Sequence, residues 1–152
     1  MSEEMIVRHC APTLAGIKTG STFTCSFADR EALHKRVVEC NRMLKPKGVC
    51  VAALRVRNNR ALIYVFRPKR LRKDLEQGDV CAFLARNGYR QNSMGHCLRE
   101  LAGRLCGSQP FPHEIGLFLG YPLSDVEAFI RHQGQNSQCV GCWKAYSGGC
   151  EA

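Results

Sequence analysis

Two apolar patterns recur along this chain, and each predicts one kind of secondary structure. Residues 49–57 ("VCVAALRVR") and 60–67 ("RALIYVFR") are rich in β-branched and aromatic side chains and flank Asn58-Asn59. Asparagine tolerates positive φ, so the two runs predict a β-hairpin closed by a two-residue turn. Pro68 ends the second strand, and another strand is expected near residues 21–27.

Elsewhere apolar residues recur every three or four positions, which is typical of a helix with one buried face. Asp29 is a favourable N-cap for such a helix, and "KPKG" at residues 45–48 ends it. Residues 9–20 predict a loop or a short helix. Further helices are expected over residues 3–8, 69–76, 79–87, 93–106, 112–119 and 124–133, with a last strand at residues 138–146.

These elements predict an α+β fold. We expect a small, mostly antiparallel sheet with the hairpin at its centre, packed against several helices on one side. The chain has 152 residues, enough for one hydrophobic core, and no repeat or low-complexity linker divides it. We therefore predict a single domain over residues 1–152.

Composition indicates a cytoplasmic protein with no membrane association. The first residues, "MSEEMIVRHC", include two acidic side chains and no long apolar run, unlike a secretory signal. No segment offers the roughly 20 apolar residues that a membrane span needs. The ten cysteines should then stay reduced, and most lie in apolar runs where a thiol packs as a small hydrophobic group.

Positive charge is concentrated in one segment. The chain has 22 basic and 13 acidic residues, a formal net charge of +9. Residues 40–73 hold 11 of the basic residues and no acidic one, so the rest of the chain has a net charge of −2. This segment predicts a docking surface for phosphate, nucleic acid or an acidic protein. The alternative is a solvated hairpin whose charges prevent edge-to-edge aggregation.

Within the hairpin, a two-residue turn would make Arg57 and Arg60 cross-strand neighbours, with Arg55 on the same face. Like charges opposite one another destabilise a hairpin, and a bound anion would remove that penalty. Arginine matches phosphate and carboxylate groups with two parallel N–H donors. We therefore predict ligand contacts from Arg55, Arg57, Arg60 and from Arg67 at the end of the second strand.

Four blocks of the sequence resemble a known family. "RHCAPTLAGIKTGSTF", "ALIYVFRP", "FPHEIGLFLGYPLSDVEAFI" and "GCWKAY" occur in the order found in the domain of unknown function 3793 family, and they span nearly the whole chain. The resemblance implies a small bacterial protein. It implies no activity or cofactor. Its last block corresponds to Gly141, Trp143, Lys144 and Tyr146, whereas Cys142 is peculiar to this sequence.

Residues 111–130 predict a helical hairpin, and they do not complete a known catalytic motif. His113 and Glu114 begin an H-E-x-x-H zinc pattern, but Leu117 occupies the place of the second histidine. Two helices joined at a glycine also resemble a helix-turn-helix. Asp125 and Glu127 would repel phosphate at the start of its second helix, so nucleic acid is the less favoured partner.

A cysteine-dependent enzyme is the main alternative to a binding protein. Cys10 could act as the nucleophile if His113 lies within hydrogen-bond reach. Glu114 or another carboxylate would orient the imidazole, and Lys18 could lower the pKa of the thiol. A metal site is not expected, because structural zinc needs two closely spaced ligand pairs. The chain offers one pair with this spacing, Cys139 and Cys142.

We therefore predict a binding or accessory protein for an anionic small molecule or an acidic protein, acting through the basic β-hairpin. A small-ligand pocket is expected where residues 9–20 meet His113, with contacts from Lys18, Trp143 and Lys144. No cofactor is expected. The sequence does not determine the oligomeric state.

Overall fold

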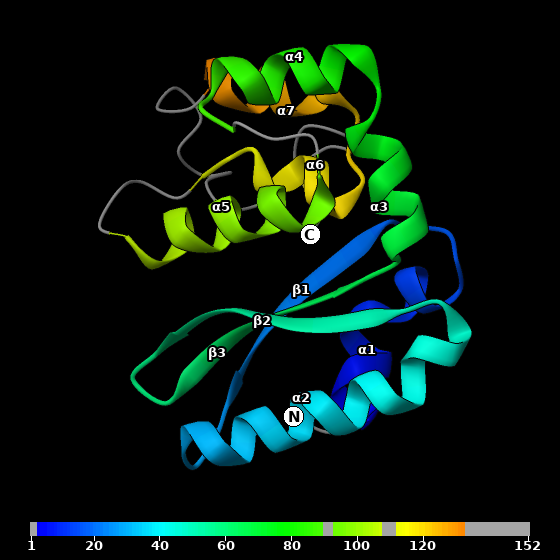
Figure 1. The fold of residues 1–152 in the computed structure, drawn as a ribbon, viewed down its shortest axis with the longest axis vertical. Coiled ribbons are helices and arrows are strands. Elements are labelled where there is room, and N and C mark those ends of the chain that lie inside the picture. Colours follow the sequence, from blue (N-terminus) through cyan, green and yellow to red (C-terminus); the bar gives the residue numbers. More distant parts are fainter. Residues whose placement is uncertain (1–2, 90–92, 108–111, 133–152) are drawn as a thin grey trace.

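The computed structural model describes residues 3–89, 93–107 and 112–132. None of the described helices has the length and apolar content needed to cross a membrane. The elements, shown in Figure 1, follow in chain order: α1 (Glu3–Leu14), β1 (Gly20–Ser26), α2 (Arg30–Leu44), the 3₁₀ turn η1 (Lys45–Lys47), β2 (Cys50–Arg57), β3 (Arg60–Phe66), α3 (Pro68–Leu75), α4 (Gly78–Arg86), α5 (Met94–Cys106), α6 (Ile115–Leu119) and α7 (Leu123–His132).

The three strands form an antiparallel sheet in the order β1-β3-β2. Asn58 and Asn59 form the turn between β2 and β3, with φ values of 51° and 60°. This left-handed pair is what a two-residue hairpin turn needs, and Arg57 faces Arg60 across it. The predicted hairpin and its register are confirmed.

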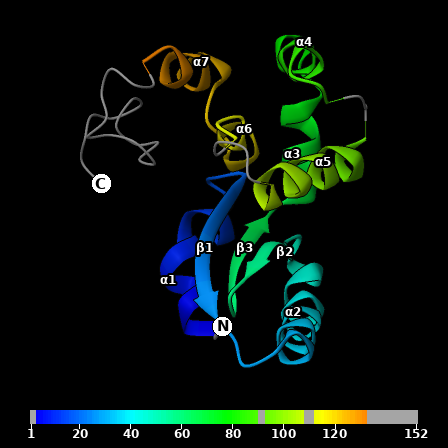
Figure 2. The same ribbon diagram turned by 90° about the vertical axis from the view of Figure 1, so that its left-hand side faces the viewer.

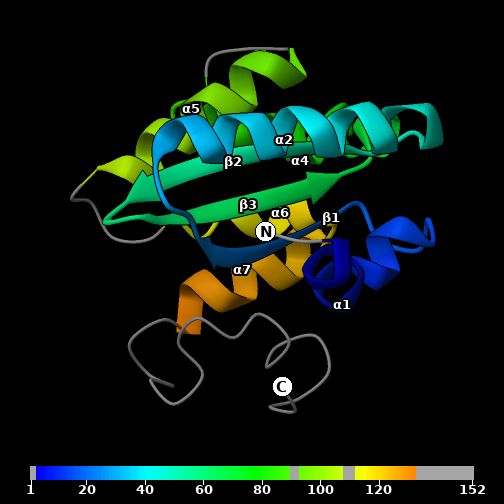
Figure 3. The same ribbon diagram turned by 90° about the horizontal axis from the view of Figure 1, so that it is seen from below.

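The central strand β3 is buried on both faces. Ala61, Ile63 and Val65 pack into one apolar cluster with residues of α1 and α2. The alternate residues Leu62, Tyr64 and Phe66 pack into a second cluster with residues of α3 to α7. Figures 1 and 3 show the two helical layers on opposite faces of the sheet.

The α+β class is confirmed, but the expectation that helices cover only one side of the sheet is wrong. In β3 apolar residues occupy both sets of alternate positions, so both faces need a cover. The layer of α1 and α2 lies beside one face of the sheet, and the larger group of helices lies across the other (Figure 2).

Two helix boundaries also differ from expectation. The first helix continues through residues 9–14 and bends at Cys10 (φ −122°, ψ 17°). Pro12 inside this helix lacks an N–H group and its ring crowds the preceding turn, which explains the bend. The helix α7 begins at Leu123, one residue before the start expected from the sequence.

A hydrogen bond adds to the apolar contacts between the larger helical layer and the sheet. The hydroxyl of Tyr64, on β3, donates a hydrogen bond to the carbonyl oxygen of Phe118, on α6. A Cβ atom at Gly20 would lie 2.6 Å from Cε1 of Tyr64 and 2.8 Å from the same carbonyl oxygen. Only glycine leaves room for this contact at the start of β1.

Truncation of Ile63 to alanine should destabilise the protein by roughly 2–5 kcal/mol, because Ile63 is fully buried and its loss leaves a cavity. Ile17→Ala is the matched control, since Ile17 is 72% exposed and should change the free energy of unfolding by about 0.5 kcal/mol or less. Urea unfolding followed by circular dichroism measures both. Equal losses of unfolding free energy in the two variants would contradict the burial of Ile63 in β3.

Candidate anion-binding site

No ion pair within the described residues neutralises the basic segment at residues 40–73. Ion pairs within the described residues join Arg36 to Glu39 and Arg104 to Glu100 and Glu114. None involves the 11 basic residues between positions 42 and 73, a range that the structure describes in full. The hairpin divides these charges into a group at its tip and a group at its base, roughly 20 Å apart for strands of this length.

At the tip, Arg55, Arg57 and Arg60 share one face of the sheet. A β-bulge between Ala53 and Arg55 shifts the register, so Arg55 pairs with Leu62 and Arg57 with Arg60. A guanidinium N–H of Arg57 donates to the carbonyl oxygen of Cys106 at 3.4 Å. That carbonyl ends α5, where the helix dipole favours a cation. Repulsion between the arginines is therefore relieved partly within the protein.

At the base, the guanidinium of Arg67 joins three separate segments. Its Nε donates to the carbonyl oxygen of Thr13 at 2.8 Å, and its Nη2 donates to that of Leu14 at 2.7 Å. Its Nη1 lies 3.4 Å from the carbonyl oxygen of Lys47, on η1. Arg67 therefore joins the end of α1 and the end of η1 to the end of β3.

Arg70, in the first turn of α3, binds the residues that follow α1. Its Nη1 and Nη2 donate to the carbonyl oxygens of Gly16 at 2.7 Å and Ile17 at 3.0 Å. These bonds hold the side chain in one orientation but leave its positive charge in place. Arg67 and Arg70 are therefore immobilised cations, whose rotamer freedom is already lost before any ligand binds.

An open pocket of about 420 Å³ lies beside these two arginines. We call it the basic pocket; it is lined by Lys45, Gly48, Cys50, Arg67, Pro68, Lys69 and Arg70. Four of these residues are cationic, and none is acidic. The pocket also lies at the N-terminal end of α3, where the helix dipole favours an anion.

The local sequence explains how the pocket forms. Gly48 ends η1 with a φ of +79°, a left-handed conformation that suits glycine, and turns the chain back into β2. Pro68 begins α3 directly after the strand, where its missing N–H removes no helical hydrogen bond. The half-buried Cys50 lines the pocket, and burial raises the pKa of its thiol while Lys45 opposes that rise.

Of the residues that line this pocket, the sequence predicts only Arg67 as a ligand contact. Lys45, Lys69 and Arg70 belong to the basic segment but are not among the predicted contacts. The available signal was Pro68 at the first position of a helix directly after a buried strand. It places a helix N-terminus, and so the first basic residues of α3, at the base of the hairpin.

The two residues of the proposed catalytic pair have different surroundings. Cys10 is fully buried in the cluster under α1 and α2, and burial raises the pKa of its thiol to about 11, partly opposed by Lys18 and a hydrogen bond to Ser21. His113 lies just before α6, with its ring 4.9 Å from that of Phe129 on α7. Burial lowers the pKa of this imidazole, and Glu114 opposes that shift.

The carboxylate of Glu114 binds other partners. It is buried and accepts hydrogen bonds from the Tyr89 hydroxyl and from Nη1 of Arg104, each at 2.9 Å. The Arg104 guanidinium also lies 4.3 Å from the centre of the Tyr89 ring. These contacts give Glu114 a structural role between α5 and α6.

The other candidate residues fall into two groups. Lys18 is half-buried, and its ammonium lies 5.2 Å from the centre of the Tyr121 ring. Trp143, Lys144, Cys139 and Cys142 lie outside the described residues. The expected ligand contacts of Trp143 and Lys144 stay predictions, and the two cysteines stay weak candidates for metal ligands. Within the described part of the chain, no group of three or more His, Cys, Asp or Glu side chains could hold a metal ion.

Replacing Arg67 by methionine should reduce the free energy of unfolding by about 2 kcal/mol, because charge-assisted bonds to the carbonyls of Thr13 and Leu14 are lost. Lys69→Met makes the same change of charge at an exposed position and should alter stability by about 0.5 kcal/mol or less. Chemical denaturation compares the two. If both variants lose the same stability, Arg67 does not hold the three segments together.

Cys10 should react slowly with iodoacetamide near neutral pH, since a raised pKa keeps the thiol protonated and only the thiolate is nucleophilic. Cys81 and Cys106 are exposed and should be alkylated first. Timed quenching and peptide mass spectrometry give the order, and unfolded protein provides the control in which Cys10 loses its protection. Preferential labelling of Cys10 in the folded protein would support the enzyme alternative.

Comparison with known proteins identifies a family but no activity. No curated protein and no solved structure matches the chain. A family described as protein of unknown function (DUF3793) matches residues 6–152, which is nearly the whole sequence and includes the basic pocket. The chain therefore belongs to this family of proteins of unknown function.

Proposed function

We propose that this protein is a binding module for an anionic ligand, which it holds in the basic pocket at the base of the β-hairpin. One observation carries the proposal. The pocket is open, four of its lining residues are cationic and none is acidic, and no ion pair within the described residues neutralises them. A phosphate or carboxylate group would supply the missing negative charge.

The four cations suit this task in different ways. The Arg67 and Arg70 side chains are already fixed by carbonyl oxygens of residues 13–17, so their charges are preorganised. Each guanidinium has five N–H donors, and these bonds leave some of them for a ligand. Lys45 and Lys69 are exposed and can adjust their ammonium groups to ligands of different size.

The arginines at the hairpin tip provide a second, less enclosed surface of the same charge. Arg60 is exposed, and it faces Arg57 across the turn. An acidic protein that contacted both ends of the hairpin would use the tip and the basic pocket together. Arg60→Glu would weaken the binding of such a partner, whereas it would not weaken the binding of a small anion in the pocket.

The two alternatives from the sequence have less support. All five residues of α6 are buried, so the first half of the helical pair is part of the core. The burial of Cys10 opposes thiolate chemistry at that position. A nucleic-acid binder and a cysteine-dependent enzyme therefore stay predictions behind the binding module.

Inorganic pyrophosphate is the simplest probe of the basic pocket. We expect it to bind at low ionic strength, and Lys45→Glu or Lys69→Glu to weaken binding at least about tenfold, which equals about 1.4 kcal/mol. Binding should also weaken as salt rises from about 20 to about 200 mM, because the pocket is open to solvent. Isothermal titration calorimetry measures both effects.

Lys35→Glu is the matched control, since Lys35 is an exposed lysine on α2 outside the pocket. It makes the same change of net charge and should leave pyrophosphate affinity within about twofold. Equal losses in all three variants would show that only net charge matters. No binding of pyrophosphate by the unaltered protein would remove the proposed function.

A further inference from the structure

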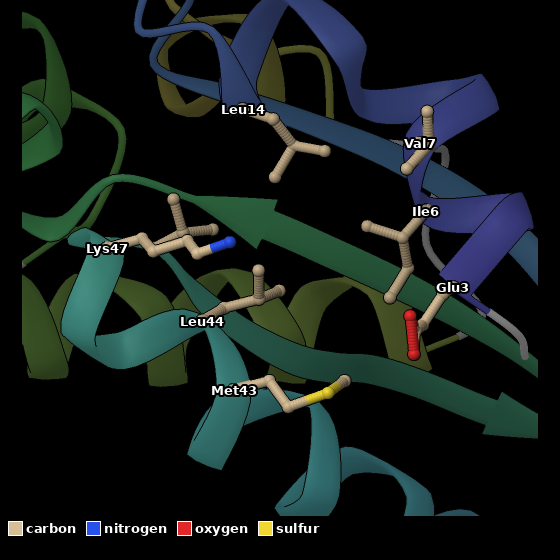
Figure 4. Close-up of a pocket in the computed structure, with 8 residues that line it drawn as sticks. Glu3, Ile6, Val7, Leu14, Met43, Leu44 and Lys47 are labelled. Carbon is tan, nitrogen blue, oxygen red and sulfur yellow. The ribbon is translucent and has the colours of Figure 1, made fainter.

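An apolar groove of about 300 Å³ lies on the other side of the chain segment that forms the basic pocket. It separates α1 from the end of α2, and Figure 4 shows the side chains of both helices directed into it. Its apolar wall consists of Ile6, Val7, Leu14, Met43, Leu44 and Val49.

This wall includes large apolar side chains that water reaches. Val7 is 57% exposed and Met43 is 44% exposed. Single exposed apolar residues are common on proteins, but here two of them line one concave site. A groove of this kind is suited to an apolar ligand group.

The ends of the groove carry opposite charges. Figure 4 shows the Lys47 ammonium at one end and the Glu3 carboxylate at the other, with the apolar side chains between them. A ligand with an anionic group would therefore enter with that group at the Lys47 end. Glu3 would repel the reverse orientation.

The Lys47 end of the groove meets the basic pocket. Along residues 44–50, Leu44, Lys47 and Val49 line the groove, whereas Lys45, Gly48 and Cys50 line the pocket. The guanidinium of Arg67 separates the two sites, and it binds the carbonyl oxygens of Leu14 and Lys47, which are both groove residues. The cation at this end of the groove, Lys47, therefore belongs to the same chain segment as Lys45 of the basic pocket.

We propose that the ligand is a single-chain anionic amphiphile, with a phosphate or carboxylate head at the Lys47 end and an alkyl chain in the groove. This inference rests on the proposed function, because the basic pocket supplies the positive potential for the head. A groove of 300 Å³ accommodates on the order of ten methylene groups if each takes up about as much space as a water molecule, roughly 30 Å³. It is too small for the apolar face of a partner helix, which presents several large side chains.

A series of alkyl phosphates tests the inference. Butyl, octyl and decyl phosphate are titrated below their micellar concentrations, with inorganic pyrophosphate as a ligand without a tail. We expect affinity to rise about fourfold for each added methylene until the groove is filled. Calorimetry on the unaltered full-length chain gives the affinities.

Two valine variants separate the groove from the pocket. Val7→Asp should abolish the gain from chain length and leave pyrophosphate binding unchanged. Val38→Asp is the matched control, because Val38 is exposed on α2 but does not line the groove. It should preserve the chain-length series, and circular dichroism verifies that both variants are folded.

The outcomes distinguish this inference from the proposed function. If pyrophosphate binds but affinity is the same for all three alkyl phosphates, the inference of an amphiphilic ligand is wrong, whereas the proposed anion-binding function is supported. If the alkyl phosphates bind in order of length but neither Lys45→Glu nor Lys69→Glu weakens them or pyrophosphate, the basic pocket is wrong. Sedimentation with phosphatidylglycerol vesicles, without binding of soluble alkyl phosphates, would overturn the inference in favour of a membrane surface.

Discussion

The burial of β3 on both faces is the constraint on which the rest of the structure depends. Its alternate residues Ile63 and Tyr64 are fully buried in different apolar clusters, so the strand forms part of two cores. A sheet of three strands has little area, and two helical layers share this one central strand. The chain that follows β3 must therefore leave the sheet at the end of this strand, next to both helical layers.

Arg67 lies at this end of the sheet, directly after β3 and before α3. Its guanidinium donates to the carbonyl oxygens of Thr13 and Leu14 at the end of α1, where the chain turns toward β1. The Thr13 oxygen also accepts from the backbone N–H of Gly16. The bonds from Arg67 fix a positive charge beside an open pocket. A residue that stabilises the fold thus also prepares the site, and the cost of ordering its side chain is met during folding.

Glu114 and Arg104, in the larger helical layer, show a different use of charge. Glu114 is buried but paired with Arg104 and hydrogen-bonded to Tyr89, so its charge stabilises the helical layer. Removal of one partner from such a group leaves a buried charge without compensation. In contrast, the cations of the basic pocket are uncompensated within the described residues and accessible to solvent. This contrast favours the basic pocket over the surroundings of His113 as the place where a ligand binds.

The sequence by itself determined the local features of this protein: the hairpin turn at Asn58 and Asn59, most helix boundaries, the α+β class and the confinement of the basic excess to one segment. These follow from short-range patterns that act within a few residues. Only the tertiary structure decided that both faces of β3 are covered, that Arg67 binds carbonyls of residues 13–14, and that Glu114 pairs with Arg104. Residues 45–50 and 67–70 form one pocket for the same reason: contacts between distant segments depend on how the helical layers pack, which no local pattern records.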